Sequence, residues 1–502
     1  MLAAVPSATL LGVEGHAVQV EVHVGGGLPV FNVVGLPDVS CREARDRVRA
    51  AIVSSGFTWP NQRITVNLAP TNLRKIGSGL DLAIAVAMLV ASDQLDTAAI
   101  EGLAMLGELG LDGTLRPILG VLPMLDAVGP MRPVVPVTNL AEARLVRHDA
   151  RAVSSLKELV AALRAEEPWP DPPVRGDVVP ERPEPDLCEV QGHPIARRAL
   201  EVAAAGGHHL LMVGPPGAGK TMLAERLPSL MPDLDHRGAM DVSRVHSAAG
   251  TLHADSGLVR RPPFRSPHHT ASLVAMVGGG SSVLRPGEVS LSSGGVLFLD
   301  ELGEFPAAHL DSLRQPLESG IIRIARATAS VTLPARFLLV AATNPCPCGV
   351  GRWGECRCTP SQLARYDRRL SSPLLDRFDI RLGIDPPEPS AVLAPDRSGE
   401  SSADVRARVA AARARAARRG VGANRELRGA ELELHAPLDD DAVELLRAQL
   451  DAGTLTMRGA QRVRSLALTL QDLEGGEGPL GLGHLEGASL LRGHEKTVRA
   501  AA

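Results

Sequence analysis

Apolar residues follow two different periods near the start of the chain. They alternate with polar residues in Val18–Val24 and Arg63–Ala69, which is the pattern of half-buried strands. Residues 42–56 and 80–92 instead have the spacing of helices. Strands and helices that alternate in this way predict an α+β fold for the N-terminal part of the chain.

Three short apolar runs without alternation mark the middle of the chain. They lie directly before Gly214, at Val296–Leu299 and within Ala335–Pro345. Such runs are typical of strands buried on both faces, as in a parallel sheet covered by helices. Apolar residues recur at helical spacing in Leu455–Leu470. The sequence therefore predicts an α/β core followed by a helical region.

Two stretches interrupt these patterns and divide the chain. Residues 166–186 are rich in proline and acidic residues, so they can hold neither a helix nor a central strand. A second polar break covers residues 385–402. We therefore expect an N-terminal domain at 1–165, a linker at 166–186, a core at 187–390 and a helical C-terminal domain at 391–502.

The composition of this 502-residue chain is that of an ordinary globular protein. Its net charge of -4 gives no general attraction to nucleic acid, so DNA binding would need local basic patches. Six cysteines in so long a chain do not suggest a secreted disulfide framework. Neither a signal peptide nor an apolar run of about 18 residues is evident, which predicts a cytoplasmic protein without membrane contact.

A phosphate-binding loop follows the first apolar run. Its pattern is G-x-x-x-x-G-K-T, between a predicted strand and a predicted helix. The loop glycines allow backbone N–H groups to face phosphate oxygens, the lysine reaches the terminal phosphates, and the threonine hydroxyl binds Mg²⁺. A plain turn between strand and helix fits this context poorly. The predicted nucleotide-binding residues are Gly214, Pro215, Pro216, Gly217, Ala218, Gly219, Lys220 and Thr221.

An acidic pair follows the second apolar run. Asp300 and Glu301 come directly after Val296–Leu299, where a parallel strand would end beside the phosphate loop. We expect Asp300 to bind Mg²⁺ and Glu301 to polarise the attacking water. The pair can alternatively cap a following helix. The combination with the phosphate loop favours hydrolysis of ATP or GTP.

Several longer motifs carry a family resemblance. The segment Arg261–Phe305, together with GPPGAGKT, ATNPCPCG and SPLLDRFDI, resembles the magnesium-chelatase-like AAA+ ATPases of the ComM (YifB) type. The resemblance spans nearly the whole chain. It implies a P-loop core with a parallel sheet and a helical lid, ATP and Mg²⁺ as ligands, and a homo-oligomer that is a hexameric ring. It also implies action on DNA, as a helicase promoting branch migration in natural transformation or recombination.

The resemblance to ring ATPases implies roles for three further residues. Asn344 follows the third apolar run and is expected to position the attacking water. Arg377, in the apolar setting of SPLLDRFDI, is a candidate arginine finger donated to a neighbouring subunit, although alone it would suit a surface salt bridge. The resemblance makes Arg458 the candidate sensor of the γ-phosphate, with Arg462 as the fallback. These two arginines can instead form a solvated basic face.

Candidate DNA contacts lie before the acidic pair. Residues 265–280 combine Arg265, His268 and His269 with a run of glycines, where related ATPases carry a hairpin that faces the ring channel. These side chains can bind a DNA backbone without sequence preference. Paired histidines can also ligate a metal or have a structural role.

Four cysteines are clustered behind Asn344 as two C-x-C pairs. They are Cys346, Cys348, Cys356 and Cys358, separated by a glycine-rich spacer. Four thiolates suit a structural Zn²⁺ ion, although C-x-C is a tighter spacing than the common C-x-x-C. A reversible disulfide and unligated thiols are the alternatives. Bound zinc would act as a clip that holds the loop between Asn344 and Arg377.

The N-terminal domain resembles the proteolytic domain of Lon proteases, which has the α+β ribosomal S5 domain 2-like fold. Where that family has its nucleophilic serine this chain has Gly79, with Ser78 one residue away, and the lysine position falls near Met124. A serine without its base is a weak nucleophile. We therefore predict a Lon-like domain without peptidase activity.

Three classes of function compete at this point. A DNA-remodelling ring motor is the prediction. A chelatase-like or chaperone-like ATPase that remodels a protein partner is the alternative, and an ATP-dependent protease is disfavoured because the serine–lysine pair is missing.

Overall fold

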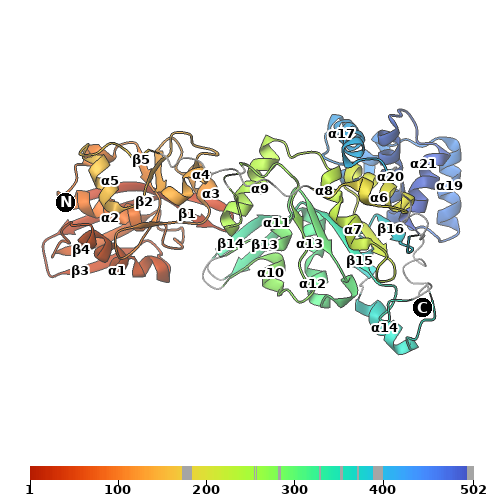
Figure 1. The fold of residues 1–502 in the computed structure, drawn as a ribbon, viewed down its shortest axis with the longest axis horizontal. Helices are drawn as coiled ribbons and strands as arrows, with labels where there is room; N and C mark the ends of the chain where they lie inside the picture. The colour runs from red at the N-terminus through yellow and green to blue at the C-terminus, as the bar shows by residue number, and fades with distance from the viewer. Residues whose placement is uncertain are drawn as a thin grey trace.

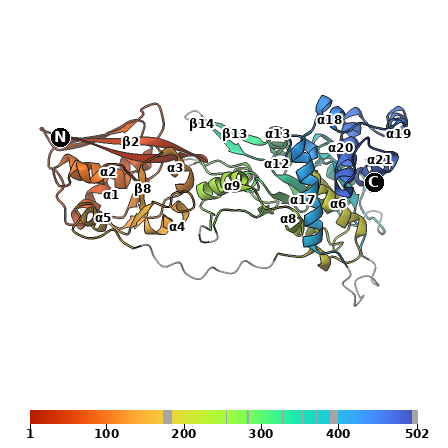
Figure 2. The ribbon, with the colours of Figure 1, turned by 90° about the horizontal axis from the view of Figure 1, so that it is seen from above.

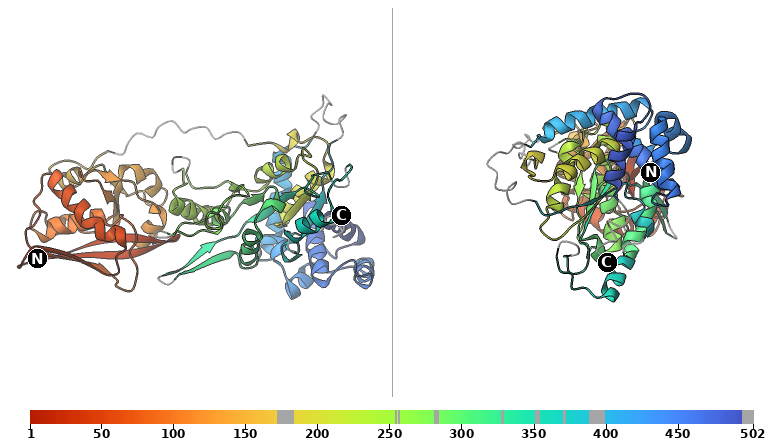
Figure 3. Two further views of the ribbon diagram at one scale, coloured as in Figure 1. Left: turned by 90° about the horizontal axis from the view of Figure 1, so that it is seen from below. Right: turned by 90° about the vertical axis from the view of Figure 1, so that its right-hand side faces the viewer.

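The described residues form three parts arranged in a row (Figure 1). In the computed structural model these residues are 1–171, 184–253, 255, 257–280, 284–326, 329–350, 354–369, 372–387 and 399–493. An N-terminal α/β part, a sheet-containing core and a helical C-terminal part follow one another along the long axis of the molecule (Figures 1 and 3). Most of the predicted linker lies outside the described residues.

Two helices cover a four-stranded sheet in the N-terminal part. Its strand order is β1-β2-β4-β3, and β3 and β4 are parallel whereas the other pairs are antiparallel. Every residue of α2 is buried, because this apolar helix lies at the centre of the N-terminal core. The elements are β1 (Leu2–Leu11), β2 (Glu14–Gly25), β3 (Val30–Val34), α1 (Val39–Ser54), β4 (Arg63–Ala69) and α2 (Asp81–Ala91).

A second, parallel sheet of order β5-β8-β9 completes this part, together with the hairpin β6–β7. The start of the predicted linker packs against it, because Trp169 lies under the guanidinium of Arg151 with 5.0 Å to the ring centroid. The elements are β5 (Leu103–Met105), β6 (Glu108–Leu109), β7 (Leu115–Arg116), α3 (Val121–Ala127), β8 (Arg132–Pro136), α4 (Leu140–Ala143), β9 (Arg151–Val153) and α5 (Leu156–Leu163).

The core contains a parallel sheet of order β11-β12-β15-β10-β16. All residues of β10, β12 and β15 are buried, as the continuous apolar runs predict. The elements around the phosphate loop are α6 (Pro194–Gly206), β10 (Leu210–Val213), α7 (Lys220–Glu225), α8 (Leu227–Leu230) and α9 (His236–Ala249). The central ones are β11 (Phe264–Arg265), α10 (Leu273–Val277), α11 (Glu288–Leu291), β12 (Val296–Leu299), α12 (Ala307–Ser312) and α13 (Arg314–Ser319). The last are β15 (Leu338–Thr343), α14 (Pro360–Arg369), α15 (Ser372–Leu375) and β16 (Ile380–Gly383).

An antiparallel hairpin of β13 (Ile321–Arg326) and β14 (Ala329–Pro334) precedes β15 and was not predicted from the sequence. It extends toward the N-terminal part (Figure 2). The turn between β1 and β2 packs against strand β14 of this hairpin, because a Cβ added to Gly12 would lie 2.2 Å from a methyl carbon of Val331. On the other side, Arg244 of α9 pairs with Asp126 of α3 at 2.7 Å. These contacts fix the N-terminal part against the core.

Five helices and a short 3₁₀ turn form the C-terminal lid. The helices are α17 (Ser402–Arg418), α18 (Gly429–His435), α19 (Asp440–Asp451), α20 (Met457–Glu474) and α21 (Leu482–Arg492). Arginines of α17 connect the lid to helix α6 of the core. Arg408 pairs with Glu201 at 2.6 Å, and Arg413 donates a hydrogen bond to the Ala204 carbonyl. The arginine-rich face of this helix is thus engaged within the protein.

The mixed α/β architecture confirms the predicted fold class: parallel sheets with helices, and a helical C-terminal part. Within the described residues, no helix combines the length and the apolar character that crossing a membrane requires.

Candidate ATP site and the surfaces around it

The phosphate loop connects β10 to α7, as its motif predicts. Gly217 and Gly219 have φ values of 77° and 82°, which L-residues with a Cβ rarely adopt. Gly214 passes so close to the Ile384 backbone that an added Cβ would lie 2.3 Å from that carbonyl oxygen. The glycines therefore allow a loop geometry that other residues would prevent.

The Lys220 ammonium group lies inside the loop. Its Nζ donates to the carbonyl oxygens of Gly214 (2.7 Å) and Pro215 (2.9 Å) and to Oδ1 of Asn344 (3.2 Å). Burial lowers its pKa from the usual value, while the nearby carboxylates of Asp300 and Glu301 act to raise it. A partly desolvated cation held by weak acceptors is ready to exchange them for phosphate oxygens.

The two predicted magnesium ligands touch each other. Thr221 Oγ1 donates to Asp300 Oδ2 at 2.7 Å, which joins the start of α7 to the end of β12. Glu301 follows with a φ of 50°, an unusual value for a glutamate, and its backbone N–H donates to Asp300 Oδ1 at 2.9 Å. Backbone strain of this kind often accompanies functional sites. Hydroxyl and carboxylate oxygens in this arrangement suit Mg²⁺.

Asn344 enters the same site from the end of β15. Its backbone carbonyl accepts a hydrogen bond from the Tyr366 hydroxyl (3.0 Å), which also lies 2.8 Å from Thr343 Oγ1. The Tyr366 ring packs on Gly303, where an added Cβ would lie 2.6 Å away. Tyr366 on α14 therefore braces both Asn344 and the acidic loop. No sequence motif marks this tyrosine, the single one in the chain.

Family models match almost every part of this chain. Magnesium chelatase, subunit ChlI, matches residues 186–392, and the model for the C-terminal region of the same subunit matches residues 399–492. A model described as subunit ChlI of Mg-chelatase matches residues 20–139. The chain belongs to the magnesium-chelatase ChlI-like family. Membership supports ATPase activity and implies ATP and Mg²⁺ as ligands, which agrees with the geometry of the site.

Relatives that match nearly the whole of this ChlI-like chain are found in bacteria. It is 44% identical over 481 residues to an uncharacterized protein of Mycobacterium tuberculosis, which covers 94% of this chain and 95% of the relative. It is 42% identical to YifB of Escherichia coli and 41% identical to the competence protein ComM of Haemophilus influenzae, with 94% of each chain covered. A distant match, 26% identical over 211 residues, links 39% of this chain to 22% of the chicken DNA helicase MCM8.

Arg377 lies away from this site. It precedes β16, whereas the phosphate loop follows β10, and these parallel strands place the two at opposite edges of the sheet. Its guanidinium pairs with Glu318 of α13 and donates to the Pro373 carbonyl. In the ChlI-like chain the predicted finger is therefore remote from the phosphate loop of its own subunit.

The lid arginines lie on the same edge as Arg377. Arg462 donates to the Phe378 carbonyl at 3.3 Å and lies 3.5 Å from Asp379. Arg458 is exposed and one helical turn earlier on α20. The described contacts do not bring either arginine to the phosphate loop of its own chain.

The candidate DNA contacts occupy different surroundings. Arg265 on β11 is tied to Glu288 by two hydrogen bonds of 2.6 and 2.7 Å, which raise its pKa, so its charge is paired within the protein. His268 is exposed, and His269 lies 3.4 Å from the carboxylate of Glu301. The structure thus joins one predicted DNA contact to the predicted water-activating residue.

The four cysteines come together in space. Their sulfur atoms all lie within 4.8 Å of one another, and none forms a disulfide. Cys356 Sγ lies 3.7 Å from the sulfur atoms of both Cys346 and Cys348, close to the ~3.8 Å edge of a tetrahedron with Zn–S bonds of about 2.3 Å. Backbone N–H groups lower the pKa of Cys348 to about 5, while burial raises that of Cys358 to about 12. The donor set fits Zn²⁺.

A cavity of ≈ 540 Å³ begins beside the phosphate loop. His193 lines it, and a Cβ added to Gly219 would lie 3.6 Å from His193 Nε2, an atom without a hydrogen-bond partner in the described structure. Gln191 and Arg197 also line this cavity. The sequence carried no motif that would have identified it.

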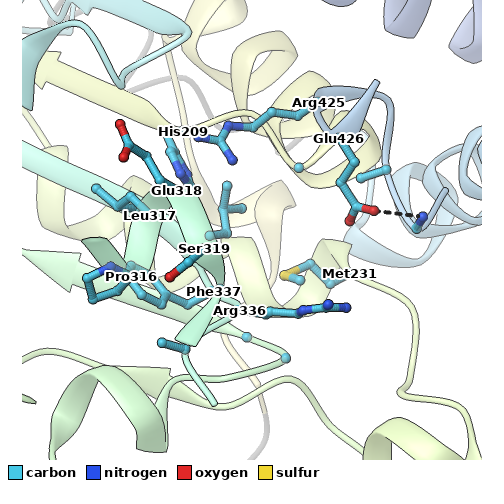
Figure 4. Close-up of a pocket in the computed structure, with 18 of the residues that line it drawn as sticks. His209, Met231, Pro316, Leu317, Glu318, Ser319, Arg336, Phe337, Arg425 and Glu426 are labelled. Atoms are coloured by element: carbon cyan, nitrogen blue, oxygen red, sulfur yellow. Dashed lines mark hydrogen bonds between the residues drawn. The ribbon is translucent and has the colours of Figure 1, made fainter. Parts of the chain in front are cut away.

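A second cavity of ≈ 350 Å³ lies at the amino ends of the strands, away from the phosphate loop (Figure 4). Glu318, Arg336 and Arg425 surround it together with His209. Burial lowers the pKa of His209 well below its usual value. Because Glu318 also pairs with Arg377, this cavity adjoins the surface that carries the candidate finger.

In the N-terminal part, the Ser78 hydroxyl donates to Glu108, and Met124 is buried. That this domain lacks peptidase activity stays a prediction.

Proposed function

We propose that this chain is a subunit of an ATP-driven ring motor that acts on DNA. One observation carries the proposal. Lys220, Asp300 and Asn344 meet at the carboxyl edge of the core sheet, whereas Arg377 stands at the amino edge, where it cannot serve the same site. A finger on the opposite edge serves the site of a neighbouring copy, and such head-to-tail contacts generate rings.

The residues divide the work of phosphoryl transfer as follows. Lys220 exchanges its carbonyl and amide acceptors for the terminal phosphates, while Thr221 and Asp300 hold Mg²⁺. Asn344 orients the water, and Glu301 accepts its proton as the water oxygen attacks the γ-phosphorus. The bond between the γ-phosphorus and the β–γ bridging oxygen breaks, and ADP leaves with the electron pair. Mg²⁺ supplies charge neutralisation when it is bound. Arg377 from the neighbouring subunit stabilises the charge that develops on the γ-phosphoryl group, and Arg458 contacts the same group.

DNA is the partner that the relatives favour. One close relative is named a competence protein, and a distant one is named a DNA helicase. We therefore assign the motor to branch migration or strand separation, in natural transformation or recombination, as a cytoplasmic hexamer. Contacts would be to the DNA backbone, because only 2% of residues are aromatic and extensive base stacking is disfavoured.

The test is the steady-state ATPase rate with and without single-stranded and branched DNA, with Lys220→Ala as the blank. Severalfold stimulation that weakens at raised salt is expected, because backbone contacts depend on ionic strength. Basal hydrolysis without any stimulation would contradict the DNA assignment. It would favour the alternative that the family name suggests, an ATPase that remodels a protein partner as in magnesium chelatase.

We also propose that the four cysteines bind one structural Zn²⁺ ion. The ion would fix the loop behind Asn344, whose carbonyl already accepts a hydrogen bond from Tyr366. Protein prepared without chelator should contain about one zinc per chain, and Cys348→Ser with Cys356→Ser should lose it. Cys188→Ser, outside the cluster, is the control. Zinc-free wild-type protein would contradict this site.

A further inference from the structure

The contact between His269 and Glu301 joins an exposed segment to the proposed catalytic carboxylate. His269 Nδ1 lies 3.4 Å from Glu301 Oε2. In the described part of the chain, this is the one ion-pair partner of the Glu301 side chain. When Nδ1 carries a proton, the imidazole attracts this carboxylate oxygen and holds it away from the water that it would otherwise meet.

The local fold explains how the two residues meet. Strand β11 lies beside β12 in parallel, so the residues after β11 cross the carboxyl end of β12, where Glu301 emerges. Bonds from Arg265 to Glu288 hold the end of β11. His269 also lies edge-on to the Phe305 ring, with 6.3 Å between centroids. The ring is therefore held by its surroundings and is not free to rotate in solvent.

The segment that carries His269 is open to solvent. We define the exposed segment as residues 266–275, of which seven are exposed. His268 stacks on His269 with 4.1 Å between ring centroids, and its Nδ1 faces the Thr270 hydroxyl at 2.8 Å. Leu273 and Val274, at the start of α10, are 39% and 53% exposed. A partner that binds this segment would displace His268, and the stacked His269 would move with it.

We propose that His269 is a positioning residue that restrains Glu301 until the exposed segment binds nucleic acid. Contact of His268 with backbone phosphates draws the stacked rings away and releases the carboxylate, which can then accept the proton of the attacking water. This proposal rests on the proposed function, because it takes Glu301 as the base and DNA as the ligand of the segment. It explains in one contact how a DNA-driven ATPase stays slow without DNA.

The test uses the full-length chain and measures kcat and KM for ATP without DNA. His269→Ala should raise the DNA-free kcat about two- to fivefold, the range expected for an exposed ion pair, with KM within about twofold of the wild type. His269→Asn keeps a donor at this position and should keep the low rate. His269→Ala combined with Glu301→Gln should be as slow as Glu301→Gln alone, because the effect acts through that carboxylate.

A second set of measurements, with DNA added, tests whether DNA acts on the ATPase rate through His269. In His269→Ala, the ratio of the DNA-stimulated to the DNA-free kcat should fall toward one. In His268→Ala, the predicted phosphate contact is lost while His269 stays beside Glu301, so the stimulation by DNA should weaken.

The proposal is overturned if the DNA-free kcat of His269→Ala is equal to or below that of the wild type. It is also overturned if this variant keeps the full stimulation ratio. A wild-type protein that DNA does not stimulate would refute the proposed function instead. The DNA-free rate of His269→Ala would still decide whether His269 restrains Glu301.

Discussion

Glu301 combines three unusual features for one residue. It has a positive φ, it directly follows a carboxylate that binds Thr221, and its side chain faces His269. Each feature alone has a structural explanation, since acidic residues also cap helices. Its place at the end of a buried strand, next to the phosphate loop, supports the proposal that Glu301 is the base that activates water.

Replacing Glu301 by Gln should therefore separate binding from hydrolysis. The amide keeps the shape of the side chain but cannot accept the proton, so kcat should fall ~10²- to 10⁴-fold while ATP binding stays within a few-fold. Glu304→Gln is the control, because Glu304 lies in the same loop and pairs with Arg369. Steady-state kinetics and equilibrium ATP binding measure the two effects. Wild-type turnover in Glu301→Gln would show that this carboxylate is not the base.

Residues in contiguous motifs could be predicted from the sequence, whereas those that act through distant partners could not. The phosphate loop is one uninterrupted motif with a stereochemical reason for each glycine. Arg265 gave no sign of its pairing with Glu288, which is 23 positions away. His269 likewise gave no sign of Glu301. Pairing across a sheet edge depends on strand order, which a single sequence does not display.

At the scale of elements, Asp379 joins the lid to the core. It directly precedes β16 and is buried, and it contacts Arg425 at 2.8 Å and Arg462 at 3.5 Å, both from the lid. Burial acts to raise its pKa, but Arg425 and then His208 and Arg462 outweigh it, so the pKa falls well below its usual value. The carboxylate thus holds two lid arginines next to the candidate finger.

We expect Asp379→Asn to destabilise the protein by about 3 kcal/mol at neutral pH, because it leaves two partly buried arginines without the buried carboxylate that pairs with them. A folded-state pKa below the unfolded value of about 3.9 contributes stability that is present above that pH and is lost as pH falls further. The difference between wild type and variant should therefore shrink below about pH 4. Denaturant unfolding at several pH values measures it, and an equal difference at pH 7 and pH 3 would contradict this role.

Elements with strong periodicity were predictable, and elements defined by pairing were not. The continuous apolar runs predicted the strands β10, β12 and β15. The polar residues that follow these strands meet at the candidate site. The hairpin β13–β14 was missed because its strands carry arginine and threonine among the apolar residues and lack a clear turn signal. From the sequence alone, the arginines of α17 could either face solvent or bind phosphate groups. Their partners Glu201 and Asp472 lie in distant elements and were not visible in the sequence.

At the scale of the whole molecule, the proposed ring would divide each ATP site between two subunits, because the phosphate loop and Arg377 lie on opposite edges of one sheet. The phosphate loop faces one side, and Arg377 with the lid arginines faces the other. The N-terminal part is fixed against the core through α3 and α9, so it can move with the ATPase core as one body. Its resemblance to Lon proteases remains a prediction, with assembly or partner contact as its expected role.

In the proposed ring, neighbouring subunits share each ATP site. Lys220→Ala removes the phosphate-loop cation but keeps the finger, whereas Arg377→Ala keeps the loop but loses the finger, which is worth about 10³-fold or more in kcat. Each variant alone should be nearly inactive. In random rings mixed from equal amounts, about a quarter of the interfaces pair an intact loop with an intact finger.

The most direct measurement is therefore the DNA-stimulated ATPase rate of the two variants, first alone and then after mixing and reassembly. We predict that the mixture recovers activity far above the sum of its parts, toward about a quarter of the wild-type rate if sites act independently. Mixing Lys220→Ala with Glu301→Gln is the control, because both lesions lie in the same half-site and no interface regains full function. A mixture with only the summed activity of its parts would contradict the shared site.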